Sequence, residues 1–435
     1  MRLNENGVEL AVGTDGSCYK NGERNAQAGA GLYINDTDER NAAVRVPARF
    51  KQSNQTAEIA AIILAAQSVD ERTRLVIESD SKTTLDALTK QAEVNEDTGY
   101  IAVQNGDLLR MAVGNLRARK AHVVFKWVKG HNGHPRNEGA DRLAAQGAEK
   151  EQPTAQWKME PPEQLRLSGA KIMSMSQSLA YKEIRQRKGK AVAQRRNTKA
   201  NIERIVEDVQ RVCNYAPSDE AIWRALEGKH VTQECKQFLW KVTHQAFRIG
   251  DYWLRDGMPD ELKTRAKCRI CDKIEDMDHI LLECESEERT LAWKLTRNLW
   301  TSTGERWIEP NWGVVVGSPC VTFRNQQGQR MSLVEARWTI LMTETAYFIW
   351  KMRCERVIKL EGARFAEQEV KRRWRSTING RLRMDRWVTS RKQTKRSLSP
   401  SELEGVWKPL LASADELPMD WTRNVGVLVG MRHDA

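Results

Sequence analysis

The amino-acid sequence predicts an α/β fold: a five-stranded mixed sheet with flanking helices over residues 8–150, followed by a mostly helical region. Short apolar runs bounded by Gly, Asn and Asp predict strands in the first third of the chain. Between these runs, apolar residues recur at the spacing of one helix face. Downstream of residue 206 the helical spacing prevails, and strand-like alternation is scarce.

The predicted sheet begins with three antiparallel strands that are joined by polar turns. A parallel strand then requires a helical crossover, and apolar residues at positions 59, 62, 63 and 66 supply the face of that helix. We expect strands at 9–17, 29–34, 43–46, 75–77 and 122–128. We expect helices at 54–67, 81–88, 101–116 and 137–148.

Length and charge restrict the class of protein. A chain of 435 residues is long enough for two or three domains. The net charge of +12 favours a polyanionic partner, yet residues 9–149 hold 18 basic and 19 acidic residues, so the excess lies downstream. The chain shows no signal-peptide pattern and no apolar run long enough to span a membrane, and three of its eight cysteines are clustered. We therefore expect an intracellular protein of the nucleus or cytoplasm, without a membrane partner.

Four acids stand at the ends of predicted strands or on helices beside them: Asp15, Glu58, Asp80 and Asp141. His131 precedes the last of them on a Gly-rich loop. Carboxylates gathered at one point repel one another unless positive charge lies between them. A pair of divalent cations supplies that charge, and metal pairs hydrolyse phosphodiesters.

The local sequences around these acids are Thr14-Asp15-Gly16-Ser17, Asn54-Gln55-Thr56-Ala57-Glu58, Ser79-Asp80-Ser81 and Gly130-His131-Asn132-Gly133 followed by Asn137-Glu138-Gly139-Ala140-Asp141. In this order and spacing, residues 9–149 resemble a type 1 ribonuclease H domain. The resemblance implies an endonuclease that hydrolyses the RNA strand of RNA–DNA hybrids with two Mg²⁺ or Mn²⁺ ions and leaves 3′-hydroxyl and 5′-phosphate ends. It also implies that the four acids hold the ions and that His131 serves proton transfer or product release.

The resemblance implies substrate-binding residues as well. Asn21, Asn54 and Gln55 match positions that contact the minor groove and the RNA 2′-hydroxyls, which distinguish RNA from DNA. Lys51, Ser53 and Asn105 match positions that hold a phosphate of the DNA strand. One departure is the segment 87–106, which is acidic where many relatives carry a basic protrusion.

A second site is predicted by the spacing C-x2-C-x7-H-x4-C, in which four soft ligands suit a closed, structural zinc ion. The alternative is a set of reduced core cysteines with an incidental histidine. The residues before the motif resemble the zinc-binding region that follows reverse transcriptases in non-LTR retrotransposons, and the whole order resembles the C-terminal part of a fungal retrotransposon polyprotein. The four ligands are Cys268, Cys271, His279 and Cys284.

We expect five segments: a ribonuclease H domain at 8–150, a basic linker at 151–205, a helical zinc-binding region at 206–305, a basic helical region at 306–400 and a tail at 401–435. The basic segments are expected to bind nucleic acid generally. Two rival functions remain. One is an inactive retroelement-derived nucleic-acid-binding protein, and the other is a nuclease of the same fold that acts on DNA.

Overall fold

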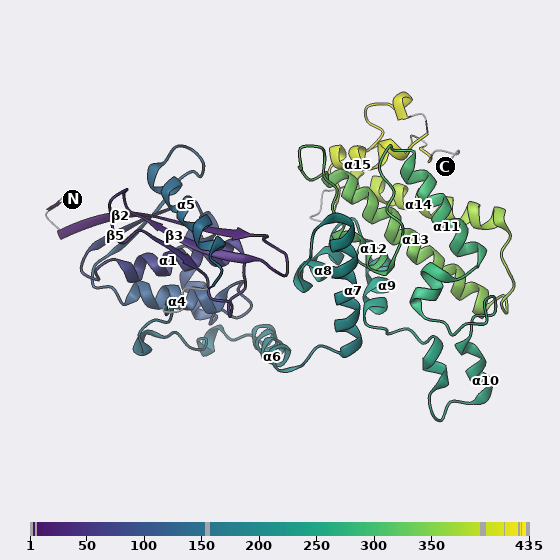
Figure 1. Cartoon of the computed structure of the whole chain (residues 1–435), viewed down its shortest axis with the longest axis horizontal. Coiled ribbons are helices and arrows are strands. Elements are labelled where there is room, and N and C mark those ends of the chain that lie inside the picture. Colours follow the sequence, from purple (N-terminus) through teal and green to yellow (C-terminus); the bar gives the residue numbers. More distant parts are fainter. Residues whose placement is uncertain are drawn as a thin grey trace. The chain divides into compact units, whose positions relative to one another are not determined.

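The computed structural model describes residues 3–4, 7–152, 157–391, 397–412, 414–424, 427 and 429–431. The chain divides into two compact units, residues 1–193 and 194–435. Figure 1 shows the first as a sheet with covering helices and the second as a bundle of helices. The finer division into five segments stays a prediction.

The first unit is built on a mixed sheet whose strand order is β4-β3-β2-β5-β6. β2, β3 and β4 are antiparallel neighbours, whereas β5 and β6 run parallel to β2. A two-residue strand, β1 (Leu3–Asn4), pairs with the start of β2. The predicted five-stranded mixed sheet is confirmed. Its strands are β2 (Gly7–Tyr19), β3 (Gln27–Tyr33), β4 (Ala42–Arg45), β5 (Arg74–Ser79) and β6 (Val123–Trp127).

Two long helices cover opposite faces of this sheet (Figure 1). α1 (Asn54–Ser68) packs on β2 and β3, and ten of its residues are buried, among them Ile59, Ile62 and Ile63. α5 (Pro135–Glu149) packs on β2, β3 and β4. The shorter helices are α2 (Lys82–Leu88), α3 (Ala92–Asp97) and α4 (Gly106–Arg117).

The helix expected at 101–116 begins later than predicted, at Gly106. Tyr100, Ala102 and Asn105 all have a positive φ, of 55°, 60° and 56°. Left-handed residues interrupt a right-handed helix, so the segment before Gly106 is a turn. The short helix α3 was not predicted.

Residues 157–176, here called the strap, lie against the first unit. They contain two helical turns, η1 (Glu163–Leu165) and η2 (Ile172–Ser174), and lead into α6 (Gln177–Ala191). The Met159 side chain is fully buried in the same apolar core as α1 and α4. The strap therefore belongs to the folded unit although its sequence reads as a linker.

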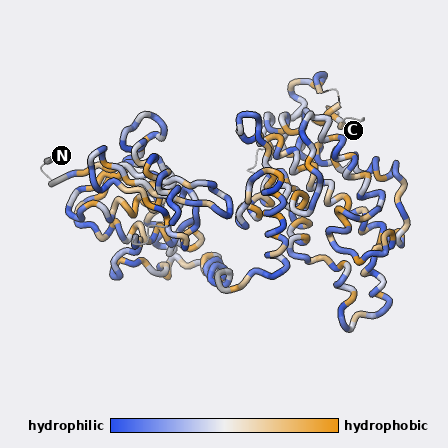
Figure 2. The backbone as a smooth tube through the Cα atoms, in the orientation of Figure 1, coloured by the Kyte–Doolittle hydropathy of each residue, from blue (hydrophilic) through white to orange (hydrophobic). Residues whose placement is uncertain are grey.

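The second unit has a long central helix, α13 (Ser332–Ile358), which packs against α11, α14 and α15. Trp300, Trp338 and Trp407 are fully buried in its core. Figure 2 shows apolar stretches along the helices of this bundle, whereas α6 is largely hydrophilic. The other helices of the second unit are α7 (Arg196–Cys213), α8 (Asp219–Leu226), α9 (Gln233–Thr243), α10 (Asp260–Lys263), α11 (Glu287–Thr301), α12 (Trp312–Val316), α14 (Glu367–Ser390) and α15 (Pro400–Trp407).

The predicted mostly helical second region is confirmed, because its remaining short elements are helical turns as well. Among the residues that the structure describes, none of the helices combines the length and the apolar character needed to cross a bilayer.

Candidate active site

Asp15 and Asp80 lie side by side because of the sheet register. β2 and β5 are parallel, and Gly13 is the partner of Glu78. Asp15 lies two residues after Gly13 within β2, and Asp80 lies two residues after Glu78, directly beyond the end of β5. Both acids therefore lie where the parallel pairing of the two strands ends. Asp15 is buried, with 7% of its surface exposed.

Glu58 reaches the same point from α1. The helix begins four residues before it, at Asn54, with Ser53 as N-cap accepting a hydrogen bond from the Thr56 backbone N–H. Gly16 allows the close approach of α1 to β2, because a Cβ on Gly16 would lie 2.2 Å from the backbone nitrogen of Glu58. One carboxylate oxygen from each of Asp15, Glu58 and Asp80 lies within 4.8 Å of the others.

Asp80 is fixed by neighbours that sequence reasoning did not single out. The Asn137 Nδ2 donates a hydrogen bond to Asp80 Oδ2 over 3.2 Å. The Trp127 indole N–H donates to the Asp80 carbonyl over 3.1 Å. A Cβ on Gly130 would lie 2.3 Å from Asp80 Oδ2, so a larger residue there would displace the Asp80 carboxylate. Asn137 and Gly130 belong to motifs that the sequence displays, but their role is visible only in the structure.

Asp141 is the fourth acid and comes from α5. Its charge and a side-chain hydrogen bond both act on Asp15, but it does not belong to the group of three whose oxygens lie within 4.8 Å of one another. His131 lies on the loop before α5, exposed to solvent, with a left-handed φ of 51°. The structure thus brings the four acids together, whereas His131 lies in an exposed loop.

The acid cluster is electrostatically uncompensated. Burial raises the pKa of Asp15 to about 7, and the charges of Asp80 and Asp141 add to the rise. Burial also raises the pKa of Glu58 well above its usual range, with further contributions from the charges of Asp15 and Asp80. Hydrogen bonds from Gly16 offset only part of these shifts. Such a cluster of hard oxygen ligands fits divalent cations.

Glu78, unlike Asp15 and Glu58, is a carboxylate whose charge neighbouring cations compensate. It is 3% exposed, and burial alone would raise its pKa, but hydrogen bonds from Lys126 and Arg136 lower the pKa below its usual value. The Lys126 Nζ lies 2.9 Å and the Arg136 Nη1 3.2 Å from its oxygens. His134 Nε2 lies 3.5 Å away. Glu78 is therefore neutralised by the protein, whereas Asp15 and Glu58 are not.

The residues expected to read the minor groove lie on two elements, the β2–β3 turn and the start of α1. Asn21 is exposed in the turn between β2 and β3. Asn54 and Gln55 begin the first turn of α1, four and three residues before Glu58. The Gln55 Nε2 donates a hydrogen bond to Thr84 Oγ1 over 3.0 Å, which fixes its side chain beside α2.

Two of the three residues expected to hold a phosphate line a cavity of about 300 Å³, here called the α4 cavity. Lys51 and Asn105 line it together with Thr56, which was not predicted. Among the described residues, the buried Asn105 Nδ2 has no hydrogen-bond acceptor. Ser53 does not line the cavity, but its hydroxyl lies 2.9 Å from Thr56 Oγ1. An unpaired buried amide donor beside a lysine suits an anionic oxygen.

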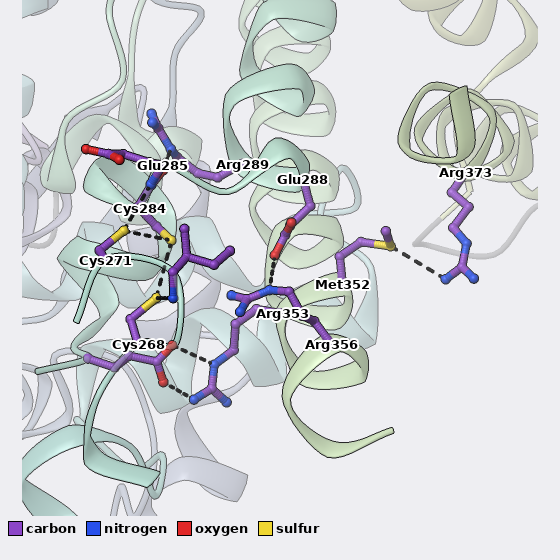
Figure 3. A network of polar contacts seen from close by, with 12 residues as sticks. Cys268, Cys271, Cys284, Glu285, Glu288, Arg289, Met352, Arg353, Arg356 and Arg373 are labelled. Atoms are coloured by element: carbon purple, nitrogen blue, oxygen red, sulfur yellow. Dashed lines mark hydrogen bonds and ion pairs between the residues drawn. The ribbon is translucent and has the colours of Figure 1, made fainter. Parts of the chain in front are cut away.

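The second predicted site, the Cys/His cluster, is also assembled. One ligand atom each from Cys268, Cys271, His279 and Cys284 lies within 4.8 Å of the others. Cys284 Sγ lies 3.7 Å from Cys268 Sγ and 3.8 Å from Cys271 Sγ (Figure 3). A hydrogen bond from Cys284 lowers the pKa of Cys268, and the same contact raises the pKa of Cys284.

Backbone N–H groups point at two of the three sulfurs. The Ile270 N–H points at Cys268 Sγ and the Glu285 N–H at Cys271 Sγ, each over 3.4 Å. Both ring nitrogens of the buried His279 lack a hydrogen-bond partner among the described residues. Three sulfurs and one imidazole with an unused nitrogen match the ligand set of a tetrahedral Zn²⁺ site.

Buried ion pairs join the Cys/His cluster to α13. Arg353 pairs with Glu275, and Arg356 Nε donates to Glu288 Oε1 over 2.7 Å, with both side chains of the latter pair 1% exposed. Arg289 donates to the carbonyls of Leu282 and Cys284. Figure 3 shows Arg353 and Arg356 projecting from one helix toward this cluster. The segment that carries the Cys/His cluster is thus tied to α13 and α11.

Together, the mixed sheet and the four carboxylates at its edge define an α/β domain with a candidate divalent-cation centre. Comparison with known proteins identifies the family. The RNase H family model matches residues 8–149. A Ribonuclease H of Novosphingobium aromaticivorans is 33% identical over 144 residues, which are 32% of this chain and 96% of that protein. The chain therefore belongs to the ribonuclease H family.

Two further similarities extend the comparison. Mouse Ribonuclease H1 is 31% identical over 150 residues, 33% of this chain and 52% of that protein, so the chain spans about half the length of this relative. The crystal structure of LC9-RNase H1, described as a type 1 RNase H with the type 2 active-site motif, is 25% identical and covers 40% of this chain and 85% of its own, with a TM-score of 0.28.

Proposed function

We propose that the protein is an endonuclease that hydrolyses the RNA strand of RNA–DNA hybrids and leaves 3′-hydroxyl and 5′-phosphate ends. The single observation that supports this most strongly is the uncompensated cluster of the buried Asp15 and the partly buried Glu58 and Asp80, with Asp141 beside it, in a domain of the ribonuclease H family. A cluster of this kind has no structural use without cations, because its mutual repulsion destabilises the fold.

Asp15, Glu58, Asp80 and Asp141 would hold two Mg²⁺ or Mn²⁺ ions. When bound, such ions supply positive charge at the scissile phosphate and activate the attacking water. Asn137 holds the Asp80 carboxylate in place by its hydrogen bond, and the Gly130 backbone lies close to the same carboxylate. His131, on an exposed loop, would move a proton or assist the release of product.

Substrate recognition would be divided between two surfaces. Asn21, Asn54 and Gln55 would contact the minor groove and the 2′-hydroxyls of the RNA strand, which a DNA duplex lacks. Lys51, Ser53 and Asn105 would hold a phosphate of the DNA strand at the α4 cavity. The unpaired Asn105 Nδ2 supports this part of the proposal.

The Cys/His cluster would hold one structural Zn²⁺ ion. The unpartnered His279 nitrogens and the close sulfurs support a ligand set of Cys268, Cys271, His279 and Cys284. The order of a ribonuclease H domain and such a region also supports descent from a retrotransposon polyprotein. Basic segments of the second unit would then bind nucleic acid generally.

The test is a cleavage assay with labelled RNA–DNA hybrid, double-stranded RNA and duplex DNA in Mg²⁺, Mn²⁺ or EDTA. We expect cutting of the hybrid alone, loss of cutting in EDTA, and a loss of at least about 10³-fold in Asp80→Asn. Asp86→Asn makes the same chemical change at an acid that pairs with Lys90 on the surface of α2, and it should stay active. Equal cutting of duplex DNA would favour a DNA nuclease, and no cutting in either metal would favour an inactive nucleic-acid-binding protein.

A further inference from the structure

The strap is anchored to the first unit at four points. Met159 is fully buried, and the Asn115 Nδ2 donates a hydrogen bond to its carbonyl over 2.8 Å. The Trp157 indole N–H donates to Gln67 Oε1 over 2.9 Å. Arg49 pairs with Glu160 at 2.6 Å.

The fourth anchor lies at the far end of the strap and uses the acidic segment 87–106. Lys171 Nζ pairs with Asp97 at 2.5 Å, and the Lys171 backbone N–H donates to the Asp97 carbonyl over 2.9 Å. Glu96 pairs with Arg117 of α4. Asp97 of this acidic segment therefore holds the far end of the strap.

The strap delivers α6 to the α4 cavity. Glu183 and Gln186 of α6 line the cavity together with Lys51, Thr56 and Asn105. α6 holds five basic residues against one acid over residues 177–191. An exposed, strongly basic helix thus lies beside the cavity that we propose to hold a phosphate.

The helix period determines which cations lie next to the cavity. Glu183 and Gln186 share one face of α6. Lys182 is four residues before Gln186 and Arg187 four residues after Glu183, so one cation flanks this face on each side. Arg187 Nε already lies 2.5 Å from Glu183 Oε1. Both Lys182 and Arg187 are exposed.

The opposite face of α6 carries equal charge away from the cavity. Tyr181, Arg185 and Lys188 follow one another at four- and three-residue spacing. The Arg185 guanidinium lies over the Tyr181 ring at 6.0 Å from its centre, and all three residues are exposed. Two pairs of cations therefore differ in position but not in charge.

We propose that α6 binds the phosphate backbone of the RNA–DNA hybrid next to the α4 cavity, with Lys182 and Arg187 as the contacting cations. This inference rests on the proposed function, because it takes the hybrid as the ligand. Glu183 is the one acid of α6 at this surface, and its charge opposes a neighbouring phosphate. α6 thereby supplies the positive surface that the segment 87–106 lacks.

The experiment measures binding of a labelled RNA–DNA hybrid to the full chain in the Asp80→Asn background, where the hybrid is not consumed, and kcat and KM separately in the active background. For Lys182→Ala with Arg187→Ala, we expect Kd and KM to rise about tenfold at moderate salt, with kcat unchanged. The logarithm of the binding constant falls linearly with the logarithm of the salt concentration, and each phosphate contact contributes roughly 0.9 to the magnitude of that slope. Loss of two contacts should therefore reduce the magnitude by about two. Glu183→Gln should tighten binding about threefold.

The matched control is Arg185→Ala with Lys188→Ala, which removes the same charge from the opposite face and should change Kd less than about threefold. Equal effects of the two double variants, no effect of the first, or weaker binding by Glu183→Gln would each overturn the proposal. Wild-type protein that binds hybrid with the expected dependence on Lys182 and Arg187, yet never cuts it, would overturn the proposed hydrolysis and support the role of α6.

Discussion

The Asn137 side chain donates a hydrogen bond from Nδ2 to Oδ2 of Asp80 across 3.2 Å, from the first turns of α5 to the end of β5. The contact joins two elements that are almost sixty residues apart in the chain. It fixes one oxygen of the Asp80 carboxylate.

Replacing Asn137 with Ala should lower kcat/KM for hybrid cleavage about 10- to 100-fold, because partners of a metal ligand orient that ligand. The measurement is a steady-state assay over a range of Mg²⁺ concentrations, in which the variant should need more Mg²⁺ for half-maximal rate. Asn132→Ala, on the exposed loop before α5, is the control. Wild-type Mg²⁺ dependence in Asn137→Ala would show that the contact does not orient Asp80.

Asp15→Asn should stabilise the metal-free protein at neutral pH. The ordinary pKa of an aspartate, taken here for the unfolded chain, is 3.8, whereas the pKa of Asp15 in the folded protein is about 7. The folded state therefore binds the proton more tightly, and this group makes wild-type stability fall as the pH rises between these values. A shift of about three units corresponds to about 4 kcal/mol as an upper limit.

Urea unfolding in EDTA across this pH range checks the prediction. The variant's advantage should grow from acidic to neutral pH and become constant above about pH 7. Added Mg²⁺ should shrink the advantage, because wild type regains a partner for its carboxylate. An advantage that does not change with pH would contradict the assigned shift.

Cys271→Ser should remove about one equivalent of zinc per chain, measured by elemental analysis of protein purified in the presence of Zn²⁺. Cys213→Ser is a matched control, since Cys213 is partly buried and its Sγ donates to the Val209 carbonyl, a contact that a serine hydroxyl can keep. Zinc content that is equal in both variants would refute the Cys/His site.

Arg356→Met should destabilise the second unit by about 3–5 kcal/mol, because it leaves the Glu288 carboxylate buried without its partner. Changing both residues to apolar ones should cost less than the single change. Arg224→Ala breaks an exposed pair with Glu220 and should cost at most about 1 kcal/mol. Urea titrations followed by tryptophan fluorescence provide the free energies of unfolding.

Met159→Ala should destabilise the first unit by about 2–5 kcal/mol, because it empties a site in the shared core. Met173 lies in the same strap with its side chain fully exposed, so Met173→Ala should be neutral. Hydrogen exchange of the amides in α1 and α4 reports on this unit directly. Equal protection in both variants would mean that the strap contributes nothing to the core.

The sequence predicted the sheet well because its strands carry the necessary periodicity and its turns carry Gly, Asn and Asp. It also pointed to the four acids, although their meeting depends on the pairing of Gly13 with Glu78. That register is a tertiary property, which no local pattern contains. The metal and substrate roles of these residues stay predictions that the experiments above test.

Other features could not be predicted for physical reasons. The late start of α4 follows from left-handed residues such as Tyr100 and Ala102, which are not glycines and carry no conformational signal. The strap has no repeating pattern, since one methionine and a few side-chain hydrogen bonds hold it. Thr56 and Asn137 acquire their candidate roles only from contacts across the fold.

The burial of Met159 determines where this chain can be truncated. The recurring family unit ends at residue 149, ten positions before the methionine that completes its interior. Truncating the chain at the family boundary would expose the apolar surfaces of α1 and α4 that Met159 covers, and the truncated protein would tend to aggregate. The same restriction would apply in evolution, since recombination at that boundary separates the ribonuclease H domain from the methionine that fills its core.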